Sequence, residues 1–573
     1  MHSADIQKRP RHFLPAGFTL TGWDRLEPFF TELEARPIGS VSELEQWLRD
    51  ASELEAAISE DACWRQIRMT CDTENKELEA AFNYFMLEIQ PKIQPVADRL
   101  NRKLIDCPFT AALESSKYET YLRNVRKNID LFREANITLQ ADLNVMQQQF
   151  GVIAGKMTVE VGGQEYTLQQ AARFLEDPDR GLRESVYHKI GRRRLQDKAE
   201  LNTLFTRLLE KRHQVALNAG FGNYRDYRFT ELGRFDYTKE DCFRFHEAVH
   251  RYVMPLVDEL YAAKKEKLGV AVLRPWDLEA EPAGITPLRP FTSGTELTVK
   301  TIDCFERLSP FFAACLKKMR ELGHLDLESR KGKAPGGYNC PLAETGAPFI
   351  FMNAAGTLDD VTTMVHEGGH AIHSFLTHEL ELTGFKEYPT EIAEVASMAM
   401  ELFSMDHWSV FFPDPTELQR AREQQLERVI TIFPWIATID RFQHWIYEHP
   451  HHSEAERTAA WMDSLDRFTS SAIDVSGLEE YRAWAWQRQL HLFEVPFYYI
   501  EYGIAQLGAI GLWQQYKKDP AAALRNYSRA LEAGGTKKLP ELFRAAGLEF
   551  DLSPEHIRSL MQFVRQEMQA IAS

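Results

Sequence analysis

Residues 361–376 read VTTMVHEGGHAIHSFL, and apolar residues at helical spacing in this stretch predict a buried helix. His366 and His370 are one helical turn apart, so both imidazoles are expected on one face, where they can bind one metal ion. Glu367 lies between them and can reach a water on that ion. The two consecutive glycines between the histidines each cost about 1 kcal/mol relative to alanine in a helix. That cost makes sense if another chain segment or a substrate approaches the helix closely.

A catalytic zinc site of this kind needs a third protein ligand, which is commonly a carboxylate. The helix-like run TEIAEVASMAMELF, residues 390–403, offers Glu391, Glu394 and Glu401. If this helix returns antiparallel to the first one, it places a carboxylate beside the two imidazoles. Glu394 is the preferred third ligand, and Glu391, one turn earlier on a similar face, is the alternative.

The same pattern occurs a second time, as HEAVH at residues 246–250, so the pattern alone does not identify the metal site. The nearest acids, Asp258 and Glu259, continue on the same amphipathic stretch, and we interpret this copy as part of an exposed helix. Another group of histidines surrounds Pro450 in a polar context that predicts a solvated turn without a metal. This group comprises His444, His449, His451 and His452.

The composition is that of a globular protein large enough for more than one lobe. The chain has 573 residues, of which 44 % are hydrophobic and 26 % charged. This length predicts two or more lobes around a shared cleft. Helical spacing of apolar residues dominates, for example in 201–219 and 417–433, and a β-hairpin is expected at 157–168 around a Gly-Gly pair.

A glycine-rich loop and a predicted strand precede the HEGGH motif. The loop KGKAPGGY occupies residues 331–338, and Gly336 and Gly337 would let the part that carries Tyr338 close over a substrate. A plain surface turn is the alternative for this loop. The apolar segment 349–353 is expected to form a strand whose edge pairs with an extended peptide.

Charge and cysteine content exclude several classes of partner and site. The formal net charge of −17 opposes binding of a phosphate backbone, so no nucleic acid is expected, although net charge says little about the interior of a channel. The 7 cysteines are scattered singly, which indicates buried, reduced thiols. The first eighteen residues lack the apolar run of a signal peptide, and no run reaches transmembrane length. A cytoplasmic protein without membrane contact is therefore expected, and no pattern specifies an oligomeric state.

Several motifs together resemble one family of zinc peptidases. HEGGHAIH, followed by EVAS in a helix, is similar to the thimet oligopeptidase and oligoendopeptidase F family, and closest to oligoendopeptidase F. The further matching segments are LRPWDL (273–278), KAPGGY (333–338), PFIFMN (348–353) and HLFEVPFYYIEYGIAQ (491–506). The resemblance spans roughly the last three hundred residues.

The resemblance implies a mainly α, two-lobed helical metallopeptidase with a deep substrate channel and a small β element near the active site. Residues 1–195 would form an N-terminal helical lobe that includes the hairpin. Residues 196–573 would form the catalytic zinc peptidase lobe that contains HEGGH. Such a channel would admit oligopeptides and exclude folded proteins.

Carried onto this sequence, the family pattern implies one Zn²⁺ ion per chain. Its ligands would be His366, His370 and Glu394, with Glu367 as general base. In many members of the family the third position of the motif holds a bulky residue, whereas this chain has Gly368. That difference concerns the shape of the local pocket and not the ligands.

The family's C-terminal histidine and tyrosine positions would fall on His491, Tyr498 and Tyr502. His491 and Tyr498 are the candidate donors to the oxyanion of the tetrahedral intermediate, and Tyr502 is a candidate substrate contact. An ordinary aromatic core is the alternative for the tyrosines.

The function predicted from the sequence is hydrolysis of internal peptide bonds in short oligopeptides by water that zinc and Glu367 activate. A zinc carboxypeptidase or peptidyl-dipeptidase on a similar fold would differ by capturing a substrate terminus. A non-catalytic helical peptide-binding protein is a third reading, against which the intact Glu367 argues.

Overall fold

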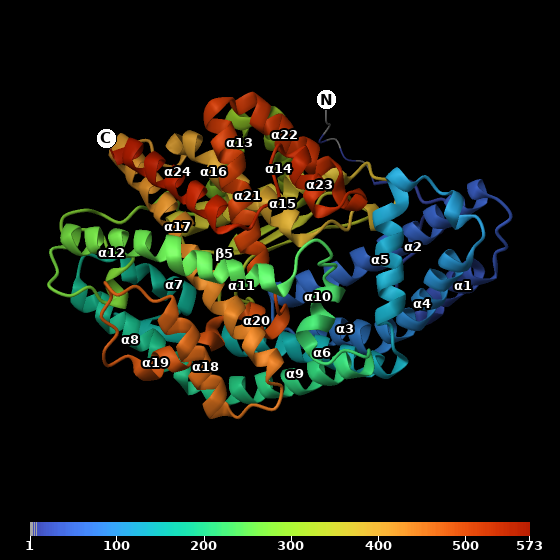
Figure 1. Ribbon diagram of the computed structural model, residues 1–573, viewed down its shortest axis with the longest axis horizontal. Coiled ribbons are helices and arrows are strands. Elements are labelled where there is room, and N and C mark those ends of the chain that lie inside the picture. Colours follow the sequence, from blue (N-terminus) through green and yellow to red (C-terminus); the bar gives the residue numbers. More distant parts are fainter. Residues whose placement is uncertain (1–3, 5, 7, 573) are drawn as a thin grey trace.

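The computed structural model describes residues 4, 6 and 8–572, and 71 % of the chain is helical, which confirms a mainly α fold. Figure 1 shows most of the first five helices gathered at one end of the molecule. These helices are α1 (Trp23–Ala35), α2 (Val41–Cys71), α3 (Lys76–Tyr84), α4 (Gln90–Asp106) and α5 (Ser115–Leu131).

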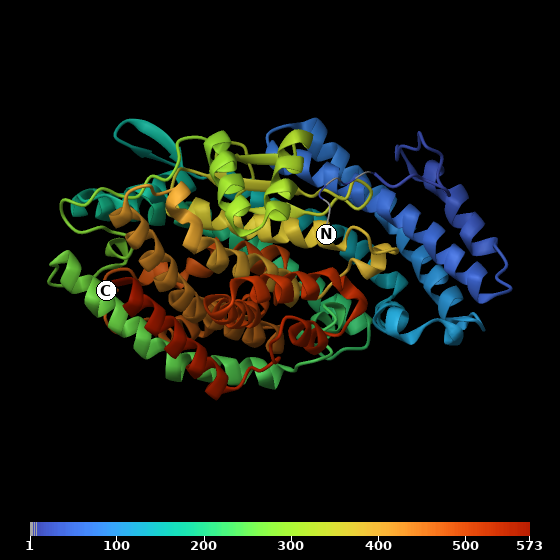
Figure 2. The same ribbon diagram turned by 90° about the horizontal axis from the view of Figure 1, so that it is seen from above.

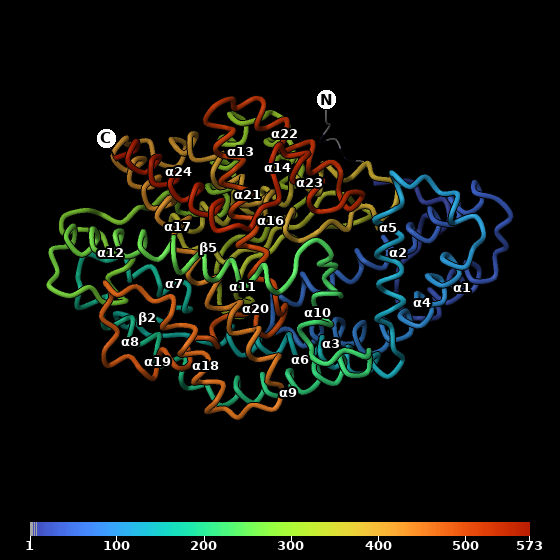
Figure 3. Tube along the Cα trace, viewed as in Figure 1, coloured from blue at the N-terminus to red at the C-terminus, as the bar shows by residue number. Residues whose placement is uncertain are grey.

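The remaining helices build the larger part of the molecule. The tube in Figure 3 follows the late part of the chain through α18, α19 and α20 to α21 near the middle. The helices after α5 are α6 (Glu134–Gly155), α7 (Leu168–Ala172), α8 (Arg180–Gln196), α9 (Lys198–Asn218), α10 (Tyr224–Glu231), α11 (Lys239–Ala248), α12 (Met254–Leu268), α13 (Gly294–Leu308), α14 (Pro310–Leu322), α15 (Leu358–Thr377), α16 (Thr390–Ser404), α17 (Pro415–Glu448), α18 (Glu454–Arg467), α19 (Glu479–Ala483), α20 (Leu490–Glu494), α21 (Tyr499–Lys518), α22 (Pro520–Glu532), α23 (Leu539–Ala545) and α24 (Pro554–Ala572).

The apolar side chains form two large clusters. One cluster runs from Leu14 to Val125 and also takes in Leu382 and Phe385, which come from the segment between α15 and α16. The other cluster takes in most buried apolar residues from Leu131 onward. At its centre α16 packs between α15 and α21, so the helix of the HEGGH motif is deeply embedded. Among the described residues, no helix is both long and apolar enough to cross a membrane.

Two small sheets interrupt the helices. Strands β1 (Thr158–Val161) and β2 (Gln164–Thr167) form the predicted hairpin, which stands at the rim of the molecule in Figure 2. The other sheet has the order β3-β5-β4, with β3 (Leu325–Glu328) parallel and β4 (Tyr338–Cys340) antiparallel to β5 (Phe349–Ala354). The strand at 349–353 was therefore predicted correctly. The expectation that its edge pairs with a peptide is wrong, because β3 and β4 occupy both of its edges.

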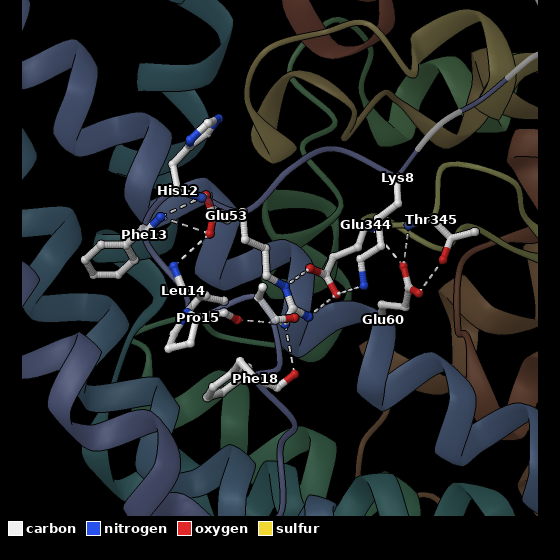
Figure 4. Close-up of polar contacts among 12 residues, drawn as sticks. Lys8, His12, Phe13, Leu14, Pro15, Phe18, Glu53, Glu60, Glu344 and Thr345 are labelled. Carbon is white, nitrogen blue, oxygen red and sulfur yellow. Dashed lines mark hydrogen bonds and ion pairs between the residues drawn. The ribbon is translucent and has the colours of Figure 1, made fainter.

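The segment of residues 8–18 fastens the first cluster to the loop that follows β4 (Figure 4). Arg11 makes two bonds to Glu344 in that loop, at 2.6 and 2.7 Å. Glu53 of α2 accepts hydrogen bonds from three successive backbone amides of the segment. Glu60, two helical turns further along α2, accepts hydrogen bonds from the backbone amides of Glu344 and Thr345 at 2.8 and 2.7 Å. These charge-assisted bonds are of the stronger class, so α2 and the β4 loop are held in one arrangement.

Two of the histidines that were expected in an exposed helix and in a solvated turn are buried, which corrects the prediction for each of them. His246 is 3 % exposed and its Nε2 lies 2.8 Å from Asp440 Oδ2. His444 is 2 % exposed, lies on α17, and has its Nε2 3.3 Å from the same oxygen. Both corrections have one cause, because α11 and α17 pack together and the carboxylate of Asp440 sits between the two rings. His449 and His452 do lie at the exposed end of α17, as predicted.

The seven cysteines are free thiols, as expected. Four of them are buried, whereas Cys63, Cys71 and Cys107 are only half-buried.

Substitution Asp440→Asn keeps the volume of this buried side chain but removes the negative charge that two imidazoles face. Loss of a partner that a buried polar group is hydrogen-bonded to costs about 1–3 kcal/mol, so the free energy of unfolding should fall by roughly that amount in denaturant titrations. Glu247→Ala is the matched control, because Glu247 lies next to His246 but is 69 % exposed and pairs only with Arg467. That variant should stay within about 1 kcal/mol of the parent. Equal stability of Asp440→Asn and the parent would show that the carboxylate does not stabilise the fold.

Candidate metal centre

Helix α15 carries the first two candidate ligands on one face. Its start is fixed by a capping box between Thr357 and Asp360, whose Oδ2 accepts three successive backbone amides at 2.8 Å. From there the helix runs unbroken through the motif, and the rings of His366 and His370 lie 5.0 Å apart between centroids. The predicted helix and the shared face of the two imidazoles are therefore present.

The two glycines of the motif make room for neighbouring chain segments. A Cβ atom on Gly369 would lie 2.5 Å from the carbonyl oxygen of Ala396 and 2.6 Å from the Cα of Ser397, both in α16. A Cβ atom on Gly368 would lie 2.7 Å from the ring of Phe305. Of the two explanations for these glycines, close approach of other parts of the chain is the one that the structure supports. Gly368 faces the core and not the pocket.

The close approach of α16 brings a third donor to the two imidazoles. Glu394 Oε2 lies 3.3 Å from His366 Nε2 and 3.6 Å from His370 Nε2. Donors that sit about 2.0–2.2 Å from a tetrahedral ion are about 3.3–3.6 Å apart, so these separations fit a zinc ion. The competing residue, Glu391, points elsewhere and accepts a hydrogen bond from Tyr237 at 2.7 Å.

A second layer of hydrogen bonds orients the first imidazole. His366 Nδ1 lies 2.7 Å from Glu401 Oε1, and Gln425 of α17 donates to the other oxygen of Glu401 at 2.9 Å. Thr362 in turn donates to Gln425 at 2.9 Å. From the sequence, Glu401 is a candidate only as a ligand. Its spacing of two helical turns from Glu394 is the signal for this supporting role, whereas nothing local to Gln425 indicates one.

Burial and charge set the protonation of the carboxylates. Burial opposes ionisation of Glu394, but His370, His366 and the hydroxyl of Tyr498 outweigh it and lower the pKa to about 2. Burial raises the pKa of Glu367 to about 7, with His366 lowering it and the carboxylate of Glu394 raising it further. Glu367 is 5 % exposed, and its Oε2 has no hydrogen-bond partner among the residues that the structure describes. One carboxylate is thus a stable anion, and the other can take up or release a proton near neutral pH.

The metal-ligand triad opens into a cavity of about 880 Å³. Every candidate site residue from the sequence lines this cavity. They are Gly336, Gly337, Tyr338, His366, Glu367, His370, Glu394, His491, Tyr498 and Tyr502. Gln66 and Thr70 of α2 also line it, so a helix from the amino-terminal end of the chain contributes to its walls.

Tyr498, His491 and Tyr502 meet at the triad. The hydroxyl of Tyr498 donates to Glu394 Oε1 at 2.5 Å. His491 Nε2 lies 3.1 Å from the hydroxyl of Tyr502, and Gln489 Nε2 lies 2.8 Å from His491 Nδ1. Burial lowers the pKa of His491 to about 4, so the ring is neutral at pH 7. If the Gln489 amide donates to Nδ1, the proton of the ring is on Nε2, which faces the cavity.

The residue before Tyr498 has an unusual backbone. Phe497 has a φ of 67°, which is rare for a bulky residue. Two partners hold it there, because Gln443 accepts its amide hydrogen at 2.5 Å and Arg234 donates to its carbonyl oxygen. Such strain is retained where surrounding contacts enforce it, often at functional sites. Here it sets the turn from which Tyr498 reaches Glu394.

The glycine-rich loop reaches the site but its tyrosine is fixed. Gly336 has a φ of 94°, which only glycine adopts readily, and a Cβ atom on Gly337 would lie 3.6 Å from Glu367 Oε1. The hydroxyl of Tyr338 lies 2.7 Å from that of Thr70 in α2, and its ring stacks on Phe351 with centroids 4.7 Å apart. The loop is therefore part of the cavity wall.

Comparisons with known proteins find relatives that are named as peptidases. The profile of the peptidase M3 N-terminal domain matches residues 13–132. Oligoendopeptidase F (plasmid form) of Lactococcus lactis subsp. cremoris is 22 % identical over 397 residues, which cover 66 % of this chain and 62 % of that protein. Oligopeptidase PepF of Bacillus subtilis (strain 168) is 24 % identical over 408 residues, or 69 % and 58 % of the two chains. The matched part therefore spans less than two thirds of these relatives.

Agreement with a solved structure is more extensive. The structure of Pz peptidase A with an inhibitor superposes with a TM-score of 0.90 at 25 % identity, covering 96 % of this chain and 97 % of that one. The profile of peptidase family M3 matches residues 173–562, a stretch that includes all three converging donors and the cavity residues of α20 and α21. On this match over more than half of its length, the chain belongs to peptidase family M3.

Proposed function

We propose that this chain is a zinc-dependent endopeptidase that hydrolyses internal bonds of short oligopeptides. The observation that carries the proposal is the convergence of His366, His370 and Glu394, with Glu367 beside them, on the wall of a single large cavity. Ligand sites of this volume enclose most of a small ligand, so an extended peptide segment fits and a folded domain does not. The names of the relatives, which are oligopeptidases, support the substrate class.

His366, His370 and Glu394 would hold one zinc ion, since their donor atoms lie within 4.8 Å of one another. When bound, zinc polarises the scissile carbonyl and makes water a stronger acid. Glu367 takes the proton of the attacking water at its unpartnered Oε2 and passes it to the leaving amine. Burial favours the protonated form of this carboxyl, which helps it take up the proton of water.

Tyr498 and His491 are our candidates for stabilising the oxyanion. Both are groups on the cavity wall that now bond within the protein, Tyr498 to Glu394 and His491 to Tyr502, and each would turn its hydrogen to the oxyanion as it forms. Tyr502 supports His491 and contacts the substrate. A hydrogen bond from either group would stabilise the negative charge as it develops on the oxygen. Gly336, Gly337 and Tyr338 form the wall along which the peptide backbone runs, and a pairing with the sheet would use β4, the edge strand that begins at Tyr338.

Two predictions from the sequence remain part of this proposal. We propose a division into lobes of residues 1–195 and 196–573 and a cytoplasmic role in peptide turnover.

A carboxypeptidase or peptidyl-dipeptidase would need a free substrate terminus. Cleavage of a peptide that is blocked at both ends would therefore support an endopeptidase.

Substitution Glu367→Gln should abolish most turnover and leave zinc in place, because the amide cannot accept the proton but does not touch the ligands. We expect kcat for a quenched fluorescent peptide to fall by about 10²–10⁴-fold, with one zinc per chain in metal analysis. Chelation of the parent should stop hydrolysis and added zinc should restore it. Glu247→Gln, in the other HExxH sequence, is the matched control and should keep full activity. Full activity of Glu367→Gln would eliminate this residue as the base.

Substitution Glu401→Gln should weaken zinc binding, because the carboxylate that orients His366 is lost. Loss of such a partner typically lowers metal affinity about 10–100-fold, which competition with a chromophoric chelator measures. Glu391→Gln removes a buried carboxylate from the same helix that is not bonded to a ligand, and zinc affinity should be unchanged. Equal affinities of all three proteins would contradict the orienting role.

Substitution Tyr498→Phe separates two roles for its hydroxyl. If the hydroxyl stabilises the transition state, kcat at saturating zinc should fall by about 10²–10³-fold while KM changes little. If it only holds Glu394, zinc affinity should fall instead and saturating zinc should restore kcat. We expect the first result, and recovery of kcat by zinc would contradict it.

A further inference from the structure

Two arginines on the cavity wall lack a counter-charge. Arg194, near the end of α8, and Arg488, at the end of the short helix Ala485–Arg488, both line the cavity that holds the metal-ligand triad. Neighbouring arginines are paired, for example Arg193 with Asp197 and Arg482 with Asp466. Within the described part of the chain, neither Arg194 nor Arg488 has an ion pair or a side-chain hydrogen bond. Their positive charges therefore face the cavity uncompensated.

The two guanidinium groups act on each other and remain charged. Burial and, to a smaller extent, the charge of Arg488 together lower the pKa of Arg194 to about 10. Since this value is well above 7, the side chain is a cation at neutral pH. Arg488 is placed by its ring contact, with its guanidinium carbon 4.4 Å from the centroid of Trp435. Two nearby cations in a partly enclosed space attract an anion more strongly than either would in open water.

The rest of the cavity wall does not supply that anion. Glu367 and Glu394 belong to the metal-ligand triad and its base. The other acid on the wall is Glu494, and burial raises its pKa to about 8, so this carboxyl is neutral at pH 7. The wall beside the arginines is largely aromatic and apolar, including Leu195 and Trp484. Although the chain carries a net charge of −17, this part of its interior is positive.

Arg488 is linked structurally to the reaction centre. The next residue, Gln489, accepts a hydrogen bond from Trp435 at 3.1 Å and lies 2.8 Å from His491 Nδ1. Trp435 thus contacts Arg488 through its ring and Gln489 through its indole N–H. The guanidinium of Arg488 and the imidazole of His491 therefore belong to one short segment, residues 488–491, which its bonds to Trp435 and within itself hold at a fixed place on the cavity wall.

We propose that Arg194 and Arg488 form an anion subsite that binds a carboxylate of the peptide substrate. This inference rests on the proposed peptidase function and specifies its substrate class. The carboxylate comes either from the C-terminus of a short peptide or from an aspartate or glutamate side chain. Both sources offer the planar pair of oxygens that a guanidinium binds through two parallel hydrogen bonds.

Four quenched fluorescent peptides of one sequence test the proposal and separate the two sources. They carry a free or amidated C-terminus, combined with an aspartate or an asparagine at one inner position. With the parent enzyme, the carboxylate that the subsite uses should lower KM, because its bonds to arginine are charge-assisted. Arg194→Gln and Arg488→Gln should each raise KM for that peptide by roughly 10–100-fold and leave the fully neutral peptide unchanged.

The matched control is Arg192→Gln, because Arg192 lies on the same helix but is exposed and does not line the cavity. This variant should keep the parent's preference among the four peptides. Equal KM values for all four peptides with the parent enzyme would overturn the subsite while leaving the peptidase intact. An equal rise in KM for charged and neutral peptides in the arginine variants would also overturn it.

A binding measurement keeps the two proposals distinguishable. Anisotropy titrations of labelled peptides with the Glu367→Gln chain report carboxylate recognition without turnover. If the parent cleaves no peptide but the carboxylate still tightens binding, the peptidase proposal fails and the subsite stands. If cleavage occurs and the carboxylate has no effect on binding, the subsite alone fails.

Discussion

The close contact between α15 and α16 is the constraint on which the site depends. Gly369 lets the backbone of α16 approach to a distance that any Cβ atom would prevent. At that distance Glu394 reaches both imidazoles, and Glu401, two turns further on, reaches the back of His366. A larger residue would separate the helices and with them the ligand from its partners. The helix penalty of the glycines is thus offset by the geometry that they permit.

The amino-acid sequence contains much of this arrangement, because the donors follow helical periodicity. The i, i+4 spacing of His366 and His370 defines one face, and the apolar pattern of residues 390–403 defines a second helix long enough to return. The choice between Glu391 and Glu394 needs the crossing of the two helices, which depends on packing. Gln425 and Arg194 carry no local signal at all, because their roles arise from contacts between segments distant in sequence.

Errors in the sequence reading also have physical causes. His246 was assigned to an exposed helix because its segment continues as an amphipathic stretch, and His444 to a solvated turn because its neighbours in the chain are polar. The structure buries them because α11 and α17 meet around Asp440, a partner almost two hundred residues from His246. The strand at 349–353 was found from its apolar run, but hydrophobicity does not reveal whether a strand is central or at an edge. Topology decides that point, and β5 is central.

The hydrogen bond between Tyr338 and Thr70 has a further consequence for the architecture. Through it the glycine-rich loop is attached to α2, a helix of the first apolar cluster, while α15 and α21 belong to the other cluster. The compartment around the ligands is consequently a joint product of both parts. Removing the amino-terminal helices would not yield a smaller working unit but a trough open to solvent along one side, because Gln66 and Thr70 would be missing from its wall and Tyr338 would lose its hydrogen-bond partner.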